Sequence, residues 1–497
     1  MESTKPKLWR CEICFQEFEG DEPPVPCPVC GADRDQFIEI DREDSLKRNT
    51  VTSSNNSGTS TRKWRCEVCF QEFEGDEPPV PCPVCGADRN SFVEITPKTS
   101  ENPINDISQD ILIIGNGAAG YYSAKAIRDK SKNANITIVS SEKYLSYFRP
   151  QVSSYLSMNK LEDSMFISPE AWYEGNNIKV ILGKTVTKID TENKKVIVEN
   201  NEDLTFDKLI IANGSRSSIL PVKGIEKINV FTLRNIDDAN NIKSAMSNSK
   251  NAVVVGGGLL GLEAAYELKE NGLNVTVVEF MPTLLGRQLD PEGAEIFKKS
   301  VDSYGINVLL GEATEEILGD PKVTGVKLKS GKIIDADLVL FSVGIIPNKE
   351  IAADTAIEVN RGIIVNDKME TSVEGVYACG DIAEINGRVY GNWPASIEMS
   401  KIAALNALGL SSQFKDFVPS TVYEGMGIKL FSCGDVNASY KNLEIKDNEG
   451  AFLEKIFFKE DIIVGGYIIG DTSSAQNIVK AIKNKDTFEG VKKNLLR

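Results

Sequence analysis

Eight of the ten cysteines in this 497-residue chain stand in four C-x-x-C pairs. The first cage would consist of Cys11 and Cys14 together with Cys27 and Cys30, and the second of Cys66 and Cys69 together with Cys82 and Cys85. Two C-x-x-C turns can close a tetrahedron of thiolates around one metal ion. Because the chain contains no histidine, neither cage has that alternative ligand, and each must consist of sulfur alone.

The spacing inside each cage favours a metal other than zinc. Twelve residues separate Cys14 from Cys27, whereas common zinc ribbons place about 15–20 between their pairs. Gly31 follows the second pair, where a tight turn needs a positive φ and can aim backbone N–H groups at sulfur. Each repeat also has three aromatic residues for a core too small to assemble readily without metal: Trp9, Phe18 and Phe37, and then Trp64, Phe73 and Phe92.

The two cages belong to a tandem duplication, because residues 9–40 align with residues 64–95 without a gap. The tract 49–61 between them is rich in Ser, Thr, Asn and Gly, so we expect a flexible tether that lets the cages move independently. A second polar stretch, 96–109, separates the repeats from the rest of the chain.

Both repeats resemble rubredoxins, and specifically the short rubredoxin module of rubrerythrins, in which four cysteines hold one iron. The resemblance implies one Fe in each cage, two in total. Phe15 and Phe70 depart from it, since rubredoxins usually have glycine there, and an altered N–H···S pattern would shift the reduction potential. Two zinc-bound docking modules are the alternative, because a tetrahedral four-sulfur site suits either metal. The acidic residues around the first cage would suit docking on a basic patch.

Two glycine-rich turns indicate nucleotide binding. Each follows an apolar strand and opens a helical segment, the context that a pyrophosphate requires. The first turn contains Gly115, Gly117 and Gly120, and the second contains Gly256, Gly258 and Gly261. After the second turn, the next strand ends at Glu279, where a carboxylate accepts from the ribose 2′-hydroxyl and repels a 2′-phosphate. The second site is therefore predicted to prefer NADH to NADPH.

Residues 110 to about 410 resemble the pyridine-nucleotide-linked flavoprotein reductases, and within them the NADH:rubredoxin oxidoreductases. Besides the glycine turns, the resemblance rests on the segments 212–215, 344–348 and 376–381. It implies that the first turn holds FAD and that Asp381, after Gly380, bonds the ribityl chain. It also implies that the segment with Arg149 and Pro150 runs past the flavin. The usual acidic partner of the FAD ribose is displaced, and Glu142 is the best candidate for it.

Other departures from this family concern the flavin's surroundings. Asn213 replaces a usual threonine, and Ser154 stands where many relatives carry a lysine that pairs with a glutamate. The matching Glu263 is present and is the nearest residue to a catalytic one, although no acid-base dyad is expected. The stretch 136–156 has no cysteine, and the two leftover cysteines, Cys379 and Cys433, are most simply buried apolar residues. Thiol chemistry at the flavin is therefore disfavoured.

The predicted fold is multidomain α/β. Two Rossmann-like dinucleotide-binding domains, for FAD and for NAD, and a small α+β C-terminal domain follow two small metal-centred rubredoxin-like domains. The predicted boundaries are 1–42 for the first rubredoxin-like domain, 43–62 for a flexible linker, 63–96 for the second such domain, 97–109 for a linker, 110–225 for the first part of the FAD domain, 226–345 for the NAD domain, 346–412 for the second part of the FAD domain, and 413–497 for the C-terminal domain.

Composition narrows the partners. The formal net charge of −16 repels phosphate backbones and anionic membranes, so neither nucleic acid nor membrane is an expected partner. There is no apolar run of about eighteen residues and no secretory signal, and paired C-x-x-C turns favour metal binding in a reducing compartment. A cytoplasmic location is the expectation.

These features together predict an NADH-dependent flavoprotein oxidoreductase. Electrons would pass from NADH through FAD to the protein's own rubredoxin-type irons and then to an external acceptor, a protein or a small oxidant. The resemblance suggests a partner that reduces oxygen, peroxide or nitric oxide in an anaerobe. One alternative is a FAD-dependent reductase of a separate carrier, with zinc-bound cages as docking modules. Another is an NADH oxidase that makes peroxide directly from reduced flavin.

Overall fold

The computed structural model of the chain divides into two compact units, residues 1–61 and residues 62–497. In the second unit, the structure describes residues 62–95, 108–200, 202–415, 417–447 and 452–495; in the first, it describes 8–11, 17–19, 22 and 37–40. Most of the two predicted linkers, 43–62 and 97–109, lies outside these ranges. None of the helices in the described ranges is both long enough and apolar enough to cross a bilayer.

The duplicated segments form the same three-stranded antiparallel sheet. In the first unit, β1 (Leu8–Cys11) lies between β2 (Glu17–Glu19) and β3 (Phe37–Ile40); in the second, β4 (Lys63–Cys66) lies between β5 (Glu72–Glu74) and β6 (Phe92–Glu94). The strand registers correspond, since Trp9 pairs with Phe18 as Trp64 pairs with Phe73. The short 3-10 helix η2 (Arg89–Ser91) precedes β6.

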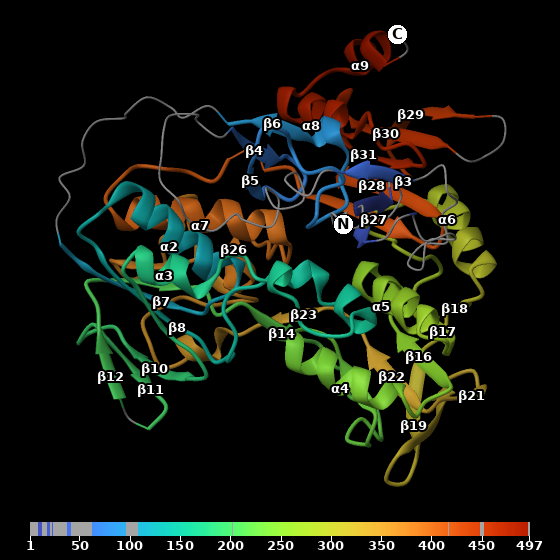
Figure 1. Ribbon diagram of the computed structural model, residues 1–497, viewed down its shortest axis with the longest axis horizontal. Coiled ribbons are helices and arrows are strands. Elements are labelled where there is room, and N and C mark those ends of the chain that lie inside the picture. Colours follow the sequence, from blue (N-terminus) through green and yellow to red (C-terminus); the bar gives the residue numbers. More distant parts are fainter. Residues whose placement is uncertain are drawn as a thin grey trace, which may run out of the picture. The chain divides into compact units, whose positions relative to one another are not determined.

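A parallel five-stranded sheet carries the first glycine turn. Its order is β25-β13-β7-β8-β9, formed by β7 (Asp110–Ile114), β8 (Asn135–Val139), β9 (Ile178–Ile181), β13 (Lys208–Ile211) and β25 (Val376–Ala378). Helices α2 (Ala118–Lys130) and α7 (Trp393–Ala407) pack against each other and against this sheet (Figure 1). Four consecutive buried residues in β7 are typical of a strand covered on both faces.

Smaller elements surround this sheet. They are α3 (Glu170–Gly175), the antiparallel strands β10 (Val186–Asp190), β11 (Lys195–Val198) and β12 (Glu202–Thr205), the parallel pair β24 (Ile363–Val365) and β26 (Ala383–Ile385), and the 3-10 helices η3 (Arg149–Gln151), η4 (Ser154–Ser157), η5 (Asp163–Met165), η6 (Lys349–Ala352) and η7 (Gly380–Ile382).

A second parallel sheet repeats the plan for the second glycine turn. Its order is β15-β22-β16-β17-β18, formed by β15 (Val230–Thr232), β16 (Asn251–Val255), β17 (Asn274–Glu279), β18 (Asn307–Leu310) and β22 (Leu338–Phe341). With it belong the helices α4 (Ile236–Met246), α5 (Leu259–Glu270) and α6 (Pro291–Ser303) and the antiparallel strands β19 (Thr314–Gly319), β20 (Val323–Leu328) and β21 (Ile333–Asp335). Strands β14 (Ser215–Ser217) and β23 (Ile345–Pro347) pair where the chain leaves one parallel sheet and returns from the other.

The C-terminal sheet is antiparallel, in the order β27-β28-β31-β30-β29. It contains β27 (Ser420–Gly425), β28 (Ile428–Gly434), β29 (Lys441–Lys446), β30 (Leu453–Lys459) and β31 (Ile462–Ile469), and it is followed by α8 (Ala475–Asn484) and α9 (Phe488–Leu495). Helix α8 packs on β31. The predicted fold class is confirmed: two Rossmann-like sheets, a small α+β C-terminal part and rubredoxin-like sheets at the N-terminus.

A buried ion cluster joins the C-terminal sheet to the NAD-side helix α6. The Lys455 side chain on β30 is only 8% exposed, and its Nζ lies 2.8 Å from Asp290, 2.8 Å from Glu292 and 3.3 Å from Glu444. Asp290 also accepts from the Tyr467 hydroxyl at 2.7 Å and caps α6 through the Gly293 N–H. These carboxylates come from α6 and from the C-terminal sheet and share one buried cation. The packing of α6 against the C-terminal sheet therefore depends on Lys455.

Replacing Lys455 by methionine is therefore expected to destabilise the protein strongly. The variant would leave the buried Asp290 carboxylate without its cation, which costs about 3–5 kcal/mol when a buried pair is broken. Thermal and denaturant unfolding would measure the loss. The matched control is Lys446→Met, since Lys446 contacts the same two glutamates but its side chain is 57% exposed, and a change below about 0.5 kcal/mol is expected there. Equal losses in both variants would contradict this account.

Candidate functional site

The second cage is assembled in the geometry of a four-sulfur metal centre. The four sulfur atoms of Cys66, Cys69, Cys82 and Cys85 all lie within 4.8 Å of one another. Two of the sulfur–sulfur distances are 3.7 Å (Cys66–Cys85) and 3.6 Å (Cys69–Cys82). A tetrahedron with metal–sulfur bonds near 2.3 Å has edges of about 3.8 Å, so the cage fits one ion.

The first cage lies mostly outside the residues that the structure describes. Cys11 is described as the last residue of β1. The other three predicted ligands, Cys14, Cys27 and Cys30, lie outside the described residues. A four-sulfur centre in the first repeat therefore stays a prediction from the sequence.

The two knuckles of the second cage have the same backbone shape although their sequences differ. The Phe70 N–H donates to the Cys66 carbonyl at 2.7 Å, and the Gly86 N–H donates to the Cys82 carbonyl at 2.8 Å. Phe70 has a φ of 60° and Gly86 a φ of 72°. The phenylalanine that departs from the rubredoxin pattern therefore keeps the tight turn, at the steric cost of a left-handed conformation, about 1–2 kcal/mol. Its ring packs toward Phe417, with centroids 6.1 Å apart.

The second rubredoxin-like module, residues 62–95, is seated on the rest of its unit by polar contacts that the sequence did not predict. Glu72 lies 3.2 Å from Lys401 on α7 and 3.9 Å from Lys125 on α2. Desolvation alone would raise the pKa of Glu72, but these lysines outweigh it and lower the pKa. The buried Tyr122 hydroxyl on α2 donates to Gln71, the neighbour of Glu72. The module therefore contacts both helices of the first dinucleotide sheet.

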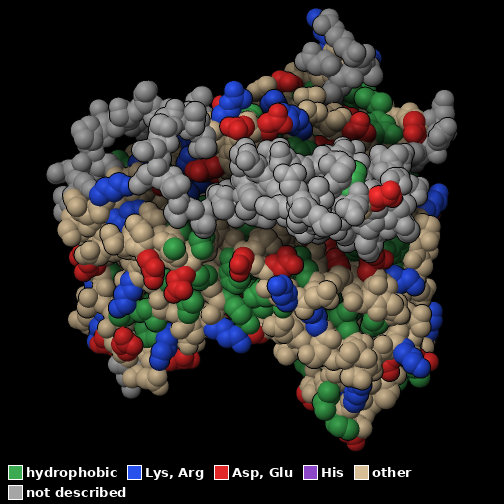
Figure 2. All heavy atoms as spheres, viewed as in Figure 1, with side chains coloured by type: hydrophobic (Ala, Val, Ile, Leu, Met, Phe, Trp, Pro, Cys, Tyr) green, Lys and Arg blue, Asp and Glu red, His purple; other side chains and the backbone are tan. Residues whose placement is uncertain are grey.

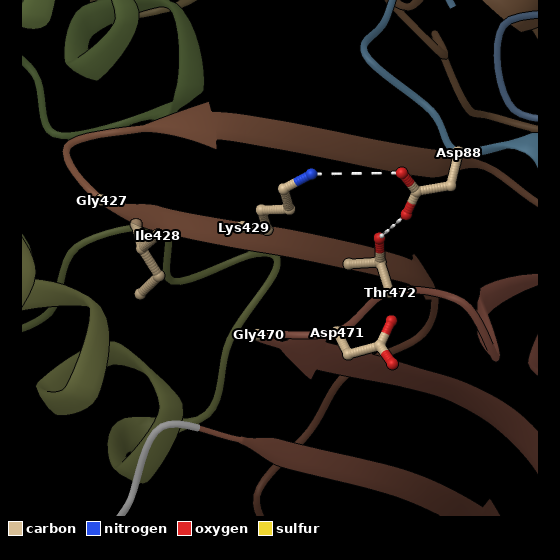
Figure 3. Close-up of a pocket in the computed structure, with 7 residues that line it drawn as sticks. All are labelled: Asp88, Gly427, Ile428, Lys429, Gly470, Asp471 and Thr472. Carbon is tan, nitrogen blue, oxygen red and sulfur yellow. Dashed lines mark hydrogen bonds and ion pairs between the residues drawn. The ribbon is translucent and has the colours of Figure 1, made fainter. Parts of the chain in front are cut away.

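Further contacts seat the module on η3 and on the C-terminal sheet. The Gln151 side chain donates to the Pro83 carbonyl, in the turn between Cys82 and Cys85. Asp88 accepts from the Thr472 hydroxyl at 3.2 Å and lies 4.0 Å from Lys429 (Figure 3). These groups line a shallow pocket with Gly427, Ile428, Gly470 and Asp471. We call the whole receiving surface the dock; it consists of Tyr122, Lys125, Gln151, Lys401, Phe417, Ser420, Lys429 and Thr472.

The first glycine turn has the close approaches that a dinucleotide cradle needs. Gly115 has a φ of 103°, and a Cβ there would lie 2.3 Å from the Ala212 carbonyl oxygen. A Cβ on Gly120 would lie 1.9 Å from the Gly115 carbonyl oxygen. Gly117, the N-cap residue of α2, faces open space: a Cβ there would meet only Arg149 Nη2, at 4.0 Å. The turn thus leaves room for a pyrophosphate at the helix N-terminus, and it fits FAD.

Two predicted FAD residues form an ion pair. Arg149 Nη2 lies 2.6 Å from Glu142, which also accepts from the Tyr147 hydroxyl at 2.6 Å. Arg149 Nη1 also donates to the Arg234 carbonyl at 2.7 Å. Glu142 is therefore held by Arg149 and Tyr147 in this structure. Pro150 lies in η3 directly after Arg149, in the segment that carries Gln151 of the dock.

Asp381 lies in a cluster that the sequence only partly predicted. It follows Gly380 in η7. Gly380 has a φ of 78°, and a Cβ on it would lie 2.8 Å from the Ala119 side chain. Its carboxylate accepts from Arg234 at 2.7 Å and from the Ser215 hydroxyl at 2.9 Å. The cluster joins η7, β14 and the segment after β15 beside the first glycine turn. It can present both a cation and a carboxylate to FAD.

The second glycine turn repeats this construction. A Cβ on Gly256 would lie 2.2 Å from the Ser342 carbonyl oxygen, and a Cβ on Gly261 would lie 2.2 Å from the Gly256 carbonyl oxygen. Gly258, at the start of α5, has nothing within 4 Å of such a Cβ. Glu279 is fixed at the end of β17, since its carboxylate accepts from the Gly257 N–H at 2.5 Å and the Met281 N–H at 2.7 Å.

Glu263 lies on α5 beside η4, which carries Ser154. Its carboxylate accepts from the Ser153 hydroxyl at 3.0 Å, so the neighbour of Ser154 is its partner. Burial raises the pKa of Glu263 to about 7, while the Ser153 hydrogen bond acts in the opposite direction. At neutral pH this carboxyl can therefore hold or release a proton.

The two leftover cysteines are buried, as predicted from the sequence. Burial raises the pKa of Cys379 to about 12 and also raises the pKa of Cys433. Because the thiolate is the reactive form, both are inert thiols near neutral pH.

Sequence reasoning missed Arg234, Ser215 and the dock. Arg234 comes from a segment without a motif, so no local signal marks it. Ser215 belongs to the segment 212–215, which carried the family resemblance, but no role was predicted for it. The dock did have a signal: phenylalanine replaces glycine at Phe15 and Phe70, and an apolar ring at a left-handed turn has a reason only if it packs on something.

The pKa of Glu263 predicts a pH-dependent effect on stability. The folded pKa, near 7, is above the ordinary value of about 4.5, so this stability contribution is complete below pH 4.5 and is lost as pH rises through 7. Glu263→Gln has no proton to lose. The free energy of unfolding of the variant, relative to wild type, should rise by up to about 3 kcal/mol between pH 5 and pH 8, because one pKa unit is about 1.4 kcal/mol.

Melting temperatures of both proteins at the two pH values would measure this change. The control is Glu226→Gln, at an exposed carboxylate, where the difference from wild type should be the same at both pH values. A constant difference for Glu263→Gln would show that this carboxyl is ionised throughout.

Three family models match the chain. Residues 109–400 match the pyridine nucleotide-disulphide oxidoreductase family, and residues 419–486 match the rubredoxin NAD+ reductase C-terminal domain. Residues 9–38 and 64–93 each match the rubredoxin-like domain of rubrerythrin. Both N-terminal repeats are therefore rubredoxin-like by sequence.

Curated relatives share the body of the chain. NADH-rubredoxin oxidoreductase of Clostridium acetobutylicum is 35% identical over 384 residues, which are 77% of this chain and 97% of that protein. Nitrite reductase [NAD(P)H] of Bacillus subtilis is 37% identical over 394 residues, 78% of this chain. The match covers 49% of that reductase, so the chain spans about half the length of this relative.

Solved structures show the same fold. NADH:rubredoxin oxidoreductase from Clostridium acetobutylicum superimposes with a TM-score of 0.66 at 34% identity, covering 78% of this chain and 97% of that one. A ferredoxin reductase from Rhodopseudomonas palustris gives a TM-score of 0.70 at 27% identity, covering 75% and 93%. Because the family model spans more than half of the chain and both glycine cradles are formed, the chain belongs to the pyridine nucleotide-disulphide oxidoreductase family, as an NADH-dependent flavoprotein oxidoreductase of the NADH:rubredoxin oxidoreductase type with rubredoxin-like N-terminal domains.

Proposed function

We propose that this protein takes electrons from NADH, passes them through FAD to its own rubredoxin-type irons, and delivers them to an external acceptor. The observation that supports this path best is the seat of the second cage. The turn between Cys82 and Cys85 contacts Gln151 of η3, the helix that also contains Arg149 and Pro150 of the predicted flavin segment. The same module contacts α2, whose first turn is the FAD cradle.

The stoichiometry matches the number of cages. NADH is oxidised to NAD+ and a proton with the release of two electrons, while each ferric four-sulfur iron accepts one. FAD supplies the conversion from hydride transfer to single-electron transfer. One NADH would therefore reduce two irons, one in each repeat, and the second cage has the dimensions of such a centre.

The chain's own residues would hold the two nucleotides at the glycine turns. Gly115, Gly117 and Gly120 would receive the FAD pyrophosphate, and Gly256, Gly258 and Gly261 that of NADH. Glu279 would accept from the NADH ribose, Asp381 would bind the ribityl chain, and Arg149 would lie along the flavin. Glu263 is the candidate to hold a proton near the flavin, since it accepts from Ser153, the neighbour of Ser154, where the family's lysine is replaced.

For the final acceptor we propose a protein or small oxidant in a chain that removes oxygen, peroxide or nitric oxide. On the face drawn in Figure 2, acidic and basic side chains are interspersed over the described surface. The charge of −16 is therefore not gathered into one field on this face. The dock presents Lys401 and Lys125 to Glu72 of the second module, a short-range contact suited to a small acidic redox module.

An anaerobic NADH titration tests the internal path. We expect about two NADH per chain to bleach a ferric-thiolate absorption together with the flavin bands, one for the two irons and one for FAD, at a rate independent of protein concentration, and metal analysis should give iron. If only flavin bands exist and bleach, and the metal is zinc, the cages are docking modules and the protein reduces a separate carrier. Oxygen uptake that persists unchanged in Cys11→Ser/Cys66→Ser would instead indicate a flavin-dependent NADH oxidase.

The contribution of the dock can be separated from that of the flavin. Lys401→Glu places a carboxylate against Glu72 and should slow bleaching of the second iron at least about tenfold, since close charge pairs are worth about 1.5 kcal/mol or more. Flavin reduction by NADH should remain unchanged. The matched control is Lys179→Glu on β9, an exposed lysine outside the dock. Equal slowing in both variants would argue against transfer within the dock.

The nucleotide preference depends on Glu279. Glu279→Gln removes the charge that repels a 2′-phosphate and weakens acceptance from a ribose hydroxyl, a hydrogen bond worth about 1.5–3 kcal/mol to a charged acceptor. The ratio of kcat/KM for NADH to that for NADPH should fall at least about tenfold. Ferricyanide as acceptor makes this assay independent of the irons. Glu295→Gln, at an exposed position on α6, is the control and should leave the ratio unchanged.

A further inference from the structure

The first repeat contains the same polar side chains, and the same phenylalanine, with which the second repeat contacts the dock. Residues 9–40 and 64–95 differ at only four of thirty-two positions. Gln71, Glu72 and Asp88 correspond to Gln16, Glu17 and Asp33, and Pro83 and Phe70 correspond to Pro28 and Phe15. The four differences are Ile13 for Val68, Asp35 for Asn90, Gln36 for Ser91 and Ile38 for Val93. Of these, Val68 accepts through its carbonyl from the Ser420 hydroxyl at 3.5 Å, and η2, which contains Asn90 and Ser91, packs on α8.

The strained phenylalanine indicates why this identity matters. Phe70 adopts a φ of 60°, a conformation in which glycine would be unstrained, and its ring packs toward Phe417 of the dock. In the second repeat, the dock therefore explains a side chain that the cage alone does not need. Phe15 stands at the same place in the sequence of the first repeat. The choice of phenylalanine over glycine at position 15 would be explained in the same way if Phe15 docked on Phe417.

The charged contacts of the dock are of the kind that can be exchanged. The Lys401 and Glu72 side chains are each 29% exposed, and those of Lys429 and Asp88 are 43% and 37% exposed. Because these pairs are only partly buried, they can separate and re-form without leaving an uncompensated buried charge. Residues 41–62, between β3 and β4, also provide a contour of roughly 70 Å, at about 3.3 Å per residue.

We propose that the two rubredoxin-like modules share one dock: residues 9–40 occupy it when residues 64–95 leave it. The dock can hold one module at a time, because Tyr122, Lys401 and Phe417 are each engaged by the module in place. The meaning of the exchange for electron flow rests on the proposed function, since each iron would be reduced in the dock and would deliver its electron outside it. The exchange itself is a binding event and requires no electron transfer.

Hydrogen exchange with mass spectrometry on the full oxidised chain tests this proposal without any redox step. Glu72→Lys/Asp88→Lys reverses both charged contacts of the second module, and Glu17→Lys/Asp33→Lys reverses the corresponding residues of the first.

The readout is protection of the dock peptides within 393–407 and 420–434. Protection should persist in the first variant, while peptides of residues 64–95 exchange faster and those of residues 9–40 exchange more slowly. Only the fourfold variant should expose the dock.

Controls keep the result interpretable. Asp76→Lys/Asp21→Lys alters an exposed carboxylate of the second repeat and the residue that corresponds to it in the sequence of the first, and it should change nothing. Unchanged metal content shows that the reversed modules still fold. If the first variant leaves residues 64–95 protected, Cys66→Ser/Cys69→Ser removes that module's metal and vacates the dock instead.

Two outcomes would overturn the proposal. The first is that the dock peptides exchange as fast in Glu72→Lys/Asp88→Lys as in the fourfold variant. The second is that the exchange of residues 9–40 is the same in Glu72→Lys/Asp88→Lys as in wild type. Failure of the proposed function gives a different result, since the NADH titration would then leave the cage chromophore unbleached whatever the exchange data show.

Discussion

The close approach of backbone to backbone at the two glycine turns is the constraint on which the rest of the molecule depends. At Gly115 and Gly256, a side chain would lie within 2.3 Å of a carbonyl on the neighbouring strand, so strand and helix meet at a distance that only glycine permits. This meeting places the start of α2 and of α5 at the end of a parallel sheet. The helix N–H groups that remain unpaired there are the donors to which a pyrophosphate binds.

The dock is built from the same elements as the first glycine turn, the predicted FAD cradle. Helix α2 begins at the cradle and carries Tyr122 one turn later, while η3 carries both Arg149 and Gln151. An electron acceptor seated on these elements is held near the predicted flavin segment by the packing of the sheet itself. Fold and proposed electron path are thus linked by short stretches of chain, and no separate recognition domain is required.

Burial of charged groups serves different purposes in different parts of the molecule. Lys455 is buried with three carboxylates that compensate it, and the cluster connects the C-terminal sheet to α6. Glu263 has a hydroxyl but no cation beside it, and its pKa rises to about 7. The first arrangement stabilises the fold, because its charges are paired, whereas the second keeps a proton available close to neutral pH.

The sequence by itself determined the chemistry of the parts. Cysteine spacing predicted the four-sulfur cages, glycine spacing after apolar strands predicted both Rossmann-like sheets, and the position of Glu279 at the end of a strand predicted its contact with a ribose, because each of these signals is local in the chain. The role predicted for Asp381 came from the resemblance to the flavoprotein reductases. Only the tertiary structure decided which parts meet. Arg234 reaches Asp381 across 147 residues, and Lys401 reaches Glu72 across 329. Such contacts arise from packing between distant elements, and no spacing rule along the chain specifies them.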